Sequence, residues 1–363
     1  MIFGDVVVPT LRRMNLVVIA ARICNDPKVK AFMKNYGPVS FAIPDKELRT
    51  FLNGPLPDST HQVMYKLRIA ELKDIFYSSS ETPVSTRNFA SPEYYTDFNM
   101  YGFTTDDLPS TLWEEMVSKK ISCLPLPNIL ERELMPVIRC ICLEIDRWQK
   151  DHKNISELDF LELQNYISWT PQGKINRIDT AKSLIRDENI PICERYNLAR
   201  HYGFLDDVVS LLKKMNEVDK FRSSRLGNQA WFAYSTNGTG ENSIYNWFDA
   251  YGNPLNFSKF FSLSEPSQKV QWYNSFLNLK YIEYDDLRFC FSLLDKNEQE
   301  NTLRQYSSKI LQYYLVWPLQ NEFLIVSKNI WPYMSIENCI DILHFIIYQR
   351  IMIGWKDFNY VGF

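Results

Sequence analysis

The sequence lacks the short motifs that identify the most common enzyme active sites. No Gly-x-Ser-x-Gly pattern occurs, which excludes a nucleophile elbow of the α/β-hydrolase type. The stretch TPQGKIN (170–176) has one glycine before its lysine, and NGTGEN (237–242) has two glycines but no lysine followed by Ser or Thr. Neither has the glycine spacing and lysine of a phosphate-binding loop, so both indicate turns. The sequence therefore predicts no catalytic residues and no cofactor.

Metal-ligating residues are few, and their spacing does not suit a shared ion. The four histidines lie in separate predicted elements. Cys140 and Cys142 are two residues apart on a predicted helix, so their side chains point to different sides. Cys193 and His201 lie on one short helix, about 12 Å apart along its axis, which is too far for one ion. We expect no metal site.

The chain also lacks a strong charge imbalance and a long apolar run. It has 40 basic and 43 acidic residues, a net charge of −3 and no long basic run, so no nucleic-acid or anionic-membrane footprint is visible. No apolar run reaches the length of a membrane span. Because Asn15 and Arg22 interrupt MNLVVIAARIC (14–24), that stretch predicts a buried helix rather than a secretory signal. Seven scattered cysteines suit reduced thiols, and we expect a cytoplasmic protein.

Helical hairpins are what the sequence does contain. In IPICERYNLARHYGFLDDVVSLLKKM (190–215), Pro191 suits the first residue of a helix, and Gly203 suits the left-handed turn that ends it. Asp206 and Asp207 are expected to cap the next helix. That helix carries an apolar stripe at Val208, Leu211, Leu212 and Met215. Helices this short are marginal alone and must bury such a stripe against a neighbour.

The same order of helix, acidic break and helix recurs at 12–33, 194–215 and 283–306, without a regular period. We therefore predict an all-α fold, an irregular α-solenoid-like stack of helical hairpins. A long loop is expected over 78–109, where Ser, Thr, Asp and Pro are frequent. The predicted domains are 1–110 and 111–363, with a boundary near 150 as an alternative. The stretch SIENCIDILHFIIYQRIMI (335–353) is apolar on nearly every side and is expected at the centre of a core.

One motif points to a partner. Residues 121–134 read ISCLPLPNILEREL, an apolar residue and Leu-Pro-Leu-Pro before a predicted helix with Ile129, Leu130 and Leu134 on its apolar side. This resembles the cullin-contacting half of a suppressor-of-cytokine-signalling box, which implies docking to elongin and a cullin. The candidate partner-binding residues are Leu124, Pro125, Leu126, Pro127, Ile129 and Leu130.

The motif departs from that family at several points. Upstream, Ser110-Thr111-Leu112 is followed by Met116 where the family has Cys, and by Lys120 where it has an apolar residue. Such boxes usually end a chain, and this one is internal. The alternative interpretation is that two prolines stiffen a linker, with Pro127 as the first residue of the helix.

A second resemblance covers most of the chain. The blocks ICNDPKVKAF, WTPQGKINRIDTAKSLI, IPICERYNLARHYGFLDDVVSLL and FIIYQRIMIGWKDFNYV resemble a large, expanded set of helical proteins in spider proteomes. That family implies a helical fold and brings no assigned activity or catalytic residues. Its tail continues past the position of Gly362-Phe363, so we expect this chain to be a shortened or alternatively ended form.

These observations favour a non-enzymatic scaffold that binds protein partners through a concave or grooved face of the helical stack. The alternative is a substrate adaptor of a cullin ubiquitin ligase that docks through Leu124–Pro127. A third hypothesis is a helical enzyme whose chemistry no residue constellation indicates.

Overall fold

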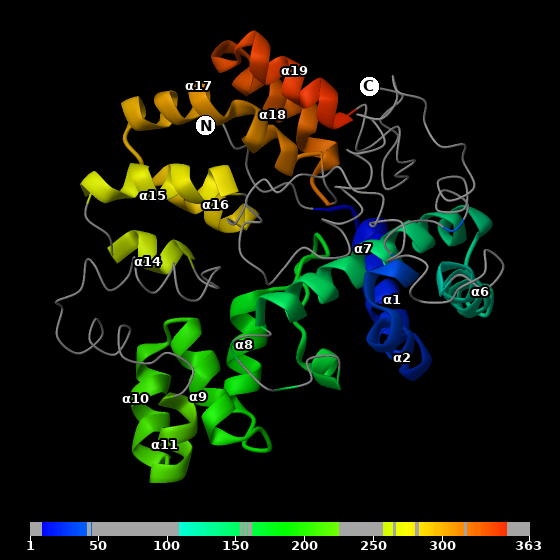
Figure 1. Cartoon of the computed structure of the whole chain (residues 1–363). Helices are drawn as coiled ribbons and strands as arrows, with labels where there is room; N and C mark the ends of the chain where they lie inside the picture. The colour runs from blue at the N-terminus through cyan, green and yellow to red at the C-terminus, as the bar shows by residue number, and fades with distance from the viewer. Residues whose placement is uncertain are drawn as a thin grey trace, which may run out of the picture. The chain divides into compact units, whose positions relative to one another are not determined.

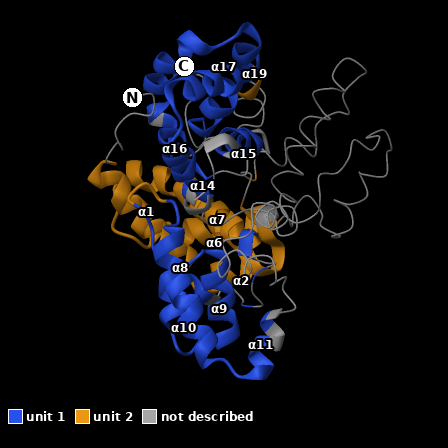
Figure 2. Ribbon diagram, turned by 90° about the vertical axis from the view of Figure 1, so that its left-hand side faces the viewer, with its two compact units in different colours: residues 1–8, 151–170, 174–343 blue, residues 9–150, 171–173, 344–363 orange. Residues whose placement is uncertain are grey.

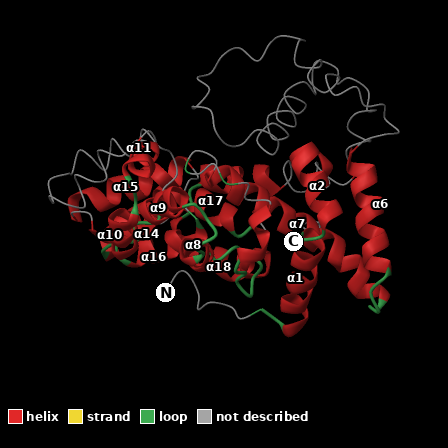
Figure 3. Cartoon of the chain, turned by 90° about the horizontal axis from the view of Figure 1, so that it is seen from below, coloured by secondary structure: helices red, strands yellow, loops and turns green. Residues whose placement is uncertain are grey.

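The computed structural model describes residues 9–41, 109–152, 162–224, 257–263, 266–279, 283–315 and 318–346, together with Asp45, Ile155 and Leu158. Within these ranges every regular element is an α-helix or a 3-10 helix (Figure 1), and β-type pairing is limited to one bridge between Trp169 and Ile175. Figure 3 shows these helices in red. The predicted all-α fold class is confirmed. The solenoid-like stacking stays a prediction, and the loop expected over 78–109 lies outside the described residues apart from Pro109.

The chain divides into two compact units, which Figure 2 shows in different colours. Unit 1 comprises residues 1–8, 151–170 and 174–343, and unit 2 comprises residues 9–150, 171–173 and 344–363. The long helix α7 (Asn128–His152) carries the chain from unit 2 into unit 1. The domains predicted from the sequence, 1–110 and 111–363 with an alternative boundary near 150, stay a prediction.

Unit 2 begins with a helical hairpin whose two ends are fixed by local capping. In α1 (Leu11–Cys24), the Thr10 side chain accepts a hydrogen bond from a backbone N–H of the first turn. The helix α2 (Pro27–Tyr36) has Pro27 at its first position, and Asp26 accepts from the Lys28 N–H at 2.9 Å. The helix predicted over 14–24 is confirmed and is buried on one face, while Val18 is 49% exposed. The 3-10 helix η1 (Gly37–Ser40) follows.

The helices α6 (Pro109–Ser122) and α7 follow in unit 2. Arg139 of α7 joins three parts of this unit. Its Nη1 donates to the Phe41 carbonyl at 2.8 Å, its Nη2 pairs with Glu114 of α6, and its guanidinium lies 4.9 Å from the centroid of the Trp113 ring. The apolar core around these contacts includes the buried side chains Val29, Met33, Trp113, Val117, Leu134, Ile138, Ile141 and Ile145.

The first group of helices in unit 1 follows a short 3-10 helix, η3 (Glu162–Tyr166), and a tight turn. They are α8 (Arg177–Arg186), α9 (Ile192–His201), α10 (Leu205–Lys214) and α11 (Glu217–Ser224). The predicted hairpin at 190–215 is confirmed as α9 and α10. Gly203 has φ +66°, the left-handed conformation expected of it. The stripe on α10 also holds, since Val208, Leu211 and Met215 are buried.

Two details of this hairpin differ from the prediction. Pro191 precedes α9 as its N-cap instead of starting the helix. Asp206 and Asp207 do not cap α10, because the chain enters the helix early and places Phe204 at the cap, without a side-chain hydrogen bond. The two aspartates lie in the first turn, where their charges still favour the positive end of the helix.

The second group in unit 1 begins with α14 (Phe257–Leu263), α15 (Pro266–Leu279), α16 (Tyr284–Ser292) and α17 (Lys296–Tyr313). The short helix η4 (Gln320–Glu322), α18 (Phe323–Ile330), η5 (Trp331–Tyr333) and α19 (Ile336–His344) follow. A capping box starts α17, where Asp295 accepts from the Glu298 N–H at 2.9 Å and Glu298 accepts from the Asp295 N–H at 2.8 Å. The helix pair predicted at 283–306 is thus confirmed as α16 and α17.

Candidate partner-binding surface

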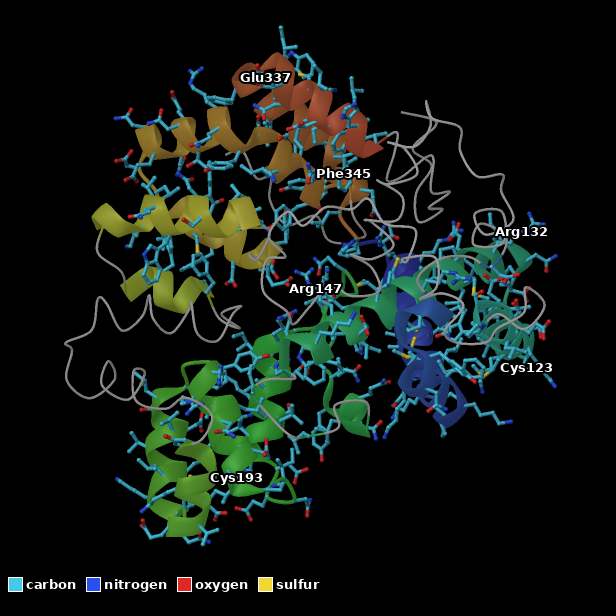
Figure 4. All side chains as sticks on the ribbon, in the orientation of Figure 1. Cys123, Arg132, Arg147, Cys193, Glu337 and Phe345 are labelled. Atoms are coloured by element: carbon cyan, nitrogen blue, oxygen red, sulfur yellow. The ribbon has the colours of Figure 1, made fainter. Side chains whose placement is uncertain are left out.

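The predicted Leu-Pro-Leu-Pro motif connects α6 to α7 at the surface of unit 2. The Leu124 N–H donates to the Ile121 carbonyl at 2.9 Å, and the Leu126 N–H donates to the Leu124 carbonyl at 2.8 Å, so the chain turns around Pro125. Pro125 and Pro127 are exposed, and Leu124 and Leu126 are half-buried. Figure 4 labels the exposed Cys123 directly before this segment. The motif is therefore accessible to a partner.

The first turn of α7 departs from the predicted amphipathic pattern. The Pro127 carbonyl accepts from the N–H groups of Leu130 and Glu131, and α7 begins one residue later than predicted, at Asn128. Leu134 is fully buried and Leu130 is half-buried, as an apolar side requires. Ile129 is 60% exposed, so its expected place on that side is wrong. It adds an apolar group to the exposed surface of the motif.

Two of the described histidines, His152 and His201, and five of the seven cysteines are buried. The three described histidines end different helices, as predicted, but the fold brings two of them into one buried region. His152 Nε2 lies 2.8 Å from the Tyr202 hydroxyl. Burial lowers the pKa of His201 well below its usual value, and the charges of Arg200 and His152 lower it further. Across the described ranges, no group of three or more His, Cys, Asp and Glu side chains could hold a metal ion.

Unit 1 contains a half-buried cluster of charged side chains. Arg177 Nη2 lies 2.6 Å from Asp151 Oδ2 and 3.3 Å from Glu283 Oε1. Burial raises the pKa of Asp286 to about 6, and its Oδ1 accepts from the Ser258 N–H at 3.2 Å. These contacts join the end of α7 to α8 and α16, and α16 to α14. Local sequence patterns do not predict these contacts, because the partners are far apart along the chain.

A group of exposed apolar side chains lies on the last described helices. It comprises Leu324 and Ile325 of α18, Trp331 of η5, and Ile336, Ile340 and Leu343 of α19, which are between 48% and 79% exposed. We call this set the C-terminal apolar surface. The expected central position of 335–353 is wrong for the described part, because only Asn338 and Ile342 are buried within α19. Residues 347–353 lie outside the described ranges.

The helix α19 carries apolar side chains on its exposed side and two polar contacts to α17. Asn338 Nδ2 donates to the Arg304 carbonyl at 3.4 Å, and Asp341 accepts from the Ser308 hydroxyl at 3.4 Å. Its exposed apolar residues Ile336, Ile340 and Leu343 recur at i, i+4 and i+7, which forms one stripe. Figure 4 labels Glu337 in the first turn of this helix. In the sequence, 335–353 is apolar on nearly every side, so its pattern does not distinguish this stripe.

Comparison with protein-family models, with curated proteins and with solved structures finds no match for this chain. The resemblances to the spider protein set and to the suppressor-of-cytokine-signalling box therefore stay predictions. Among the described helices, none combines the length and apolar character needed to cross a membrane.

Proposed function

We propose that the protein is a non-enzymatic scaffold that binds a protein partner through the C-terminal apolar surface. The exposed apolar stripe of α19 carries this proposal. An ordinary surface helix directs its apolar stripe inward, whereas α19 directs a stripe of three large aliphatic side chains outward. Contiguous exposed apolar patches of this kind identify interaction sites in folded proteins.

The composition of the surface suits a protein partner. Trp331 is 64% exposed and belongs to the residue types that dominate binding energy at interfaces. Exposed charged residues, Lys328 on α18 and Glu337 and Asp341 on α19, adjoin the apolar side chains in sequence. An apolar centre with a polar rim is the usual anatomy of a protein interface. The proposal takes the protein to act in the cytoplasm and to bind no nucleic acid.

The test compares partner capture by the full chain and by the triple variant Ile336→Ser, Ile340→Ser and Leu343→Ser. Because these side chains are exposed, each substitution is expected to change the free energy of unfolding by less than about 0.5 kcal/mol. The variant should fold normally by circular dichroism and lose specific partners in an affinity capture read by mass spectrometry. The matched control is Leu205→Ser with Val209→Ser, which removes exposed apolar groups from α10. Partners retained by the triple variant, or a large loss of stability, would overturn the proposal.

The cullin-ligase adaptor is the second candidate, favoured by the exposure of the Leu124–Pro127 segment and of Ile129. Its test is direct binding of the full chain to purified elongin and cullin. The variant in which Leu124, Pro125, Leu126 and Pro127 are all changed to Ala should lose that binding, and the triple variant of α19 should keep it. Absence of binding by the unmodified chain would eliminate the adaptor while leaving the scaffold proposal open to its own test.

A further inference from the structure

Two cysteines that are far apart in the sequence meet in the core of unit 2. The sulfur atoms of Cys24, at the end of α1, and Cys142, in the middle of α7, lie 3.4 Å apart. Both residues are fully buried, and so are their helix neighbours Ala20 and Ile138. The Cys24 thiol also lies 3.8 Å from the Ile138 carbonyl. The two thiols are therefore held against each other by the packing of two helices.

We propose that Cys24 and Cys142 form a buried disulfide site that ties α1 to α7 when the protein meets an oxidising small-molecule disulfide. The bond itself is about 2.0 Å long, so the sulfur atoms must approach by roughly 1.4 Å. The proposal requires the two side chains to rotate and the end of α1 to shift slightly for that approach. In a reducing cytoplasm the pair remains two thiols, as the cysteine pattern of the chain predicts.

The reaction is a thiol–disulfide exchange in two steps. Cys24 loses its proton and attacks one sulfur of a small-molecule disulfide such as oxidised glutathione, which releases one thiol and leaves a mixed disulfide on Cys24. Cys142 then loses its proton and displaces the second small-molecule thiol, which forms the Cys24–Cys142 bond. Two protein thiols are oxidised and one disulfide is reduced to two thiols, so electrons and atoms balance.

The order of attack follows from the positions of the two residues. Cys24 is the last residue of α1, and helix ends open locally far more often than helix centres. Cys142 lies ten residues from the end of α7, and burial raises the pKa of its thiol. We therefore expect slow oxidation of the folded chain and faster oxidation during folding, while α1 is still free to move.

The bond would close a loop that spans 118 residues and contains α2 and α6. Because a cross-link over a long loop restricts the unfolded chain strongly, the oxidised form should unfold at a higher temperature than the reduced form. Amide hydrogen exchange in α1 should slow as well. The disulfide would thus be a cross-link that stabilises unit 2, and the proposal is independent of the C-terminal apolar surface.

The test maps disulfides in the full chain after two treatments with oxidised and reduced glutathione: incubation of the folded protein, and refolding from denaturant. Free thiols are then alkylated and the protein is digested with trypsin. The expected product joins peptide 23–28 to peptide 140–147, each of which contains one of the two cysteines. Peptide 140–147 also contains Cys140, so the variant Cys140→Ser is the matched control.

The proposal predicts that the unmodified chain and Cys140→Ser give the linked peptides, whereas Cys142→Ser does not. Exposed Cys123 reports that the reagent is active, because it should carry a mixed disulfide with glutathione. If Cys123 is modified while Cys24 and Cys142 are recovered alkylated after both treatments, the pair is only two packed thiols and the proposal is overturned. A linkage that persists in Cys142→Ser and disappears in Cys140→Ser would overturn it equally.

Discussion

Removing the charge of Arg139 should destabilise unit 2 strongly. The side chain is 9% exposed, and it bonds the Phe41 carbonyl, pairs with Glu114 and lies over Trp113. A hydrogen bond from a charged donor contributes about 2 kcal/mol. The cation–π contact contributes about 1 kcal/mol. Glu114 is 31% exposed, so its pairing is weakened by water and contributes about 1 kcal/mol. Arg139→Met should therefore cost about 3 to 4 kcal/mol, from the sum of these contributions.

The assay is native-state hydrogen exchange of the full chain, read on the amides of α2 and α6, because these amides report on the stability of unit 2 itself. The exposed Arg132→Ala, on the same helix, is the control and should change stability by less than about 0.5 kcal/mol. The double variant Arg139→Met with Glu114→Gln should lose about 1 kcal/mol less stability than the sum of the losses of the two single variants. A cost below about 1 kcal/mol for Arg139→Met, or full additivity, would refute the reasoning.

Three further predictions concern unit 1. Burial raises the pKa of Asp286 in the folded state to about 6, above its unfolded value near 3.9. Between these two pH values the folded state binds more protons than the unfolded state. The stability of the wild-type protein should therefore fall as pH rises from about 4 to 6. The Asp286→Asn variant should show no such fall. In thermal melts it should be more stable than the wild type by roughly 1 to 3 kcal/mol at pH 7, and this difference should shrink at lower pH. A stability difference that does not change with pH would contradict this prediction. Asp295→Ala removes the capping box and should cost about 1 kcal/mol in urea unfolding, whereas Asp295→Ser should retain most of it. Gly203→Ala places a side chain at φ +66° and should lower the stability by about 1 kcal/mol. Amide hydrogen exchange in α9 and α10 should then be faster than in the wild type. Exchange at the wild-type rate would show that the turn tolerates alanine.

The parts of the fold that sequence predicts well are those fixed by local chemistry. Gly203 ends a helix as predicted, because only its own backbone must turn. The assignment of Asp206 and Asp207 as caps fails for a related reason. Both residues suit the start of a helix, and composition alone does not decide which residue starts it.

The tertiary features were harder to predict. Apolar periodicity shows that a side chain avoids water, but it does not show which side of the helix a neighbour covers. In α19 the neighbouring α17 bonds the polar side, so Ile340 is left exposed where a core position was expected. The contact between Cys24 and Cys142 was missed because 118 residues separate them, and local spacing rules compare only near neighbours. The exposed Leu124–Pro127 segment was found because a proline-rich connection is a local feature.

The central claim is that the exposed stripe of α19 contacts a protein partner, and site-specific photo-cross-linking tests it most directly. A photoreactive phenylalanine derivative would replace Ile340 in the full chain in living cells, with Ser210, an exposed residue of α10, as the control position. The account predicts a discrete covalent adduct from Ile340 that is absent from Ser210 and disappears when Ile336 and Leu343 are changed to Ser. The same adducts from both positions, or none from Ile340, would contradict it.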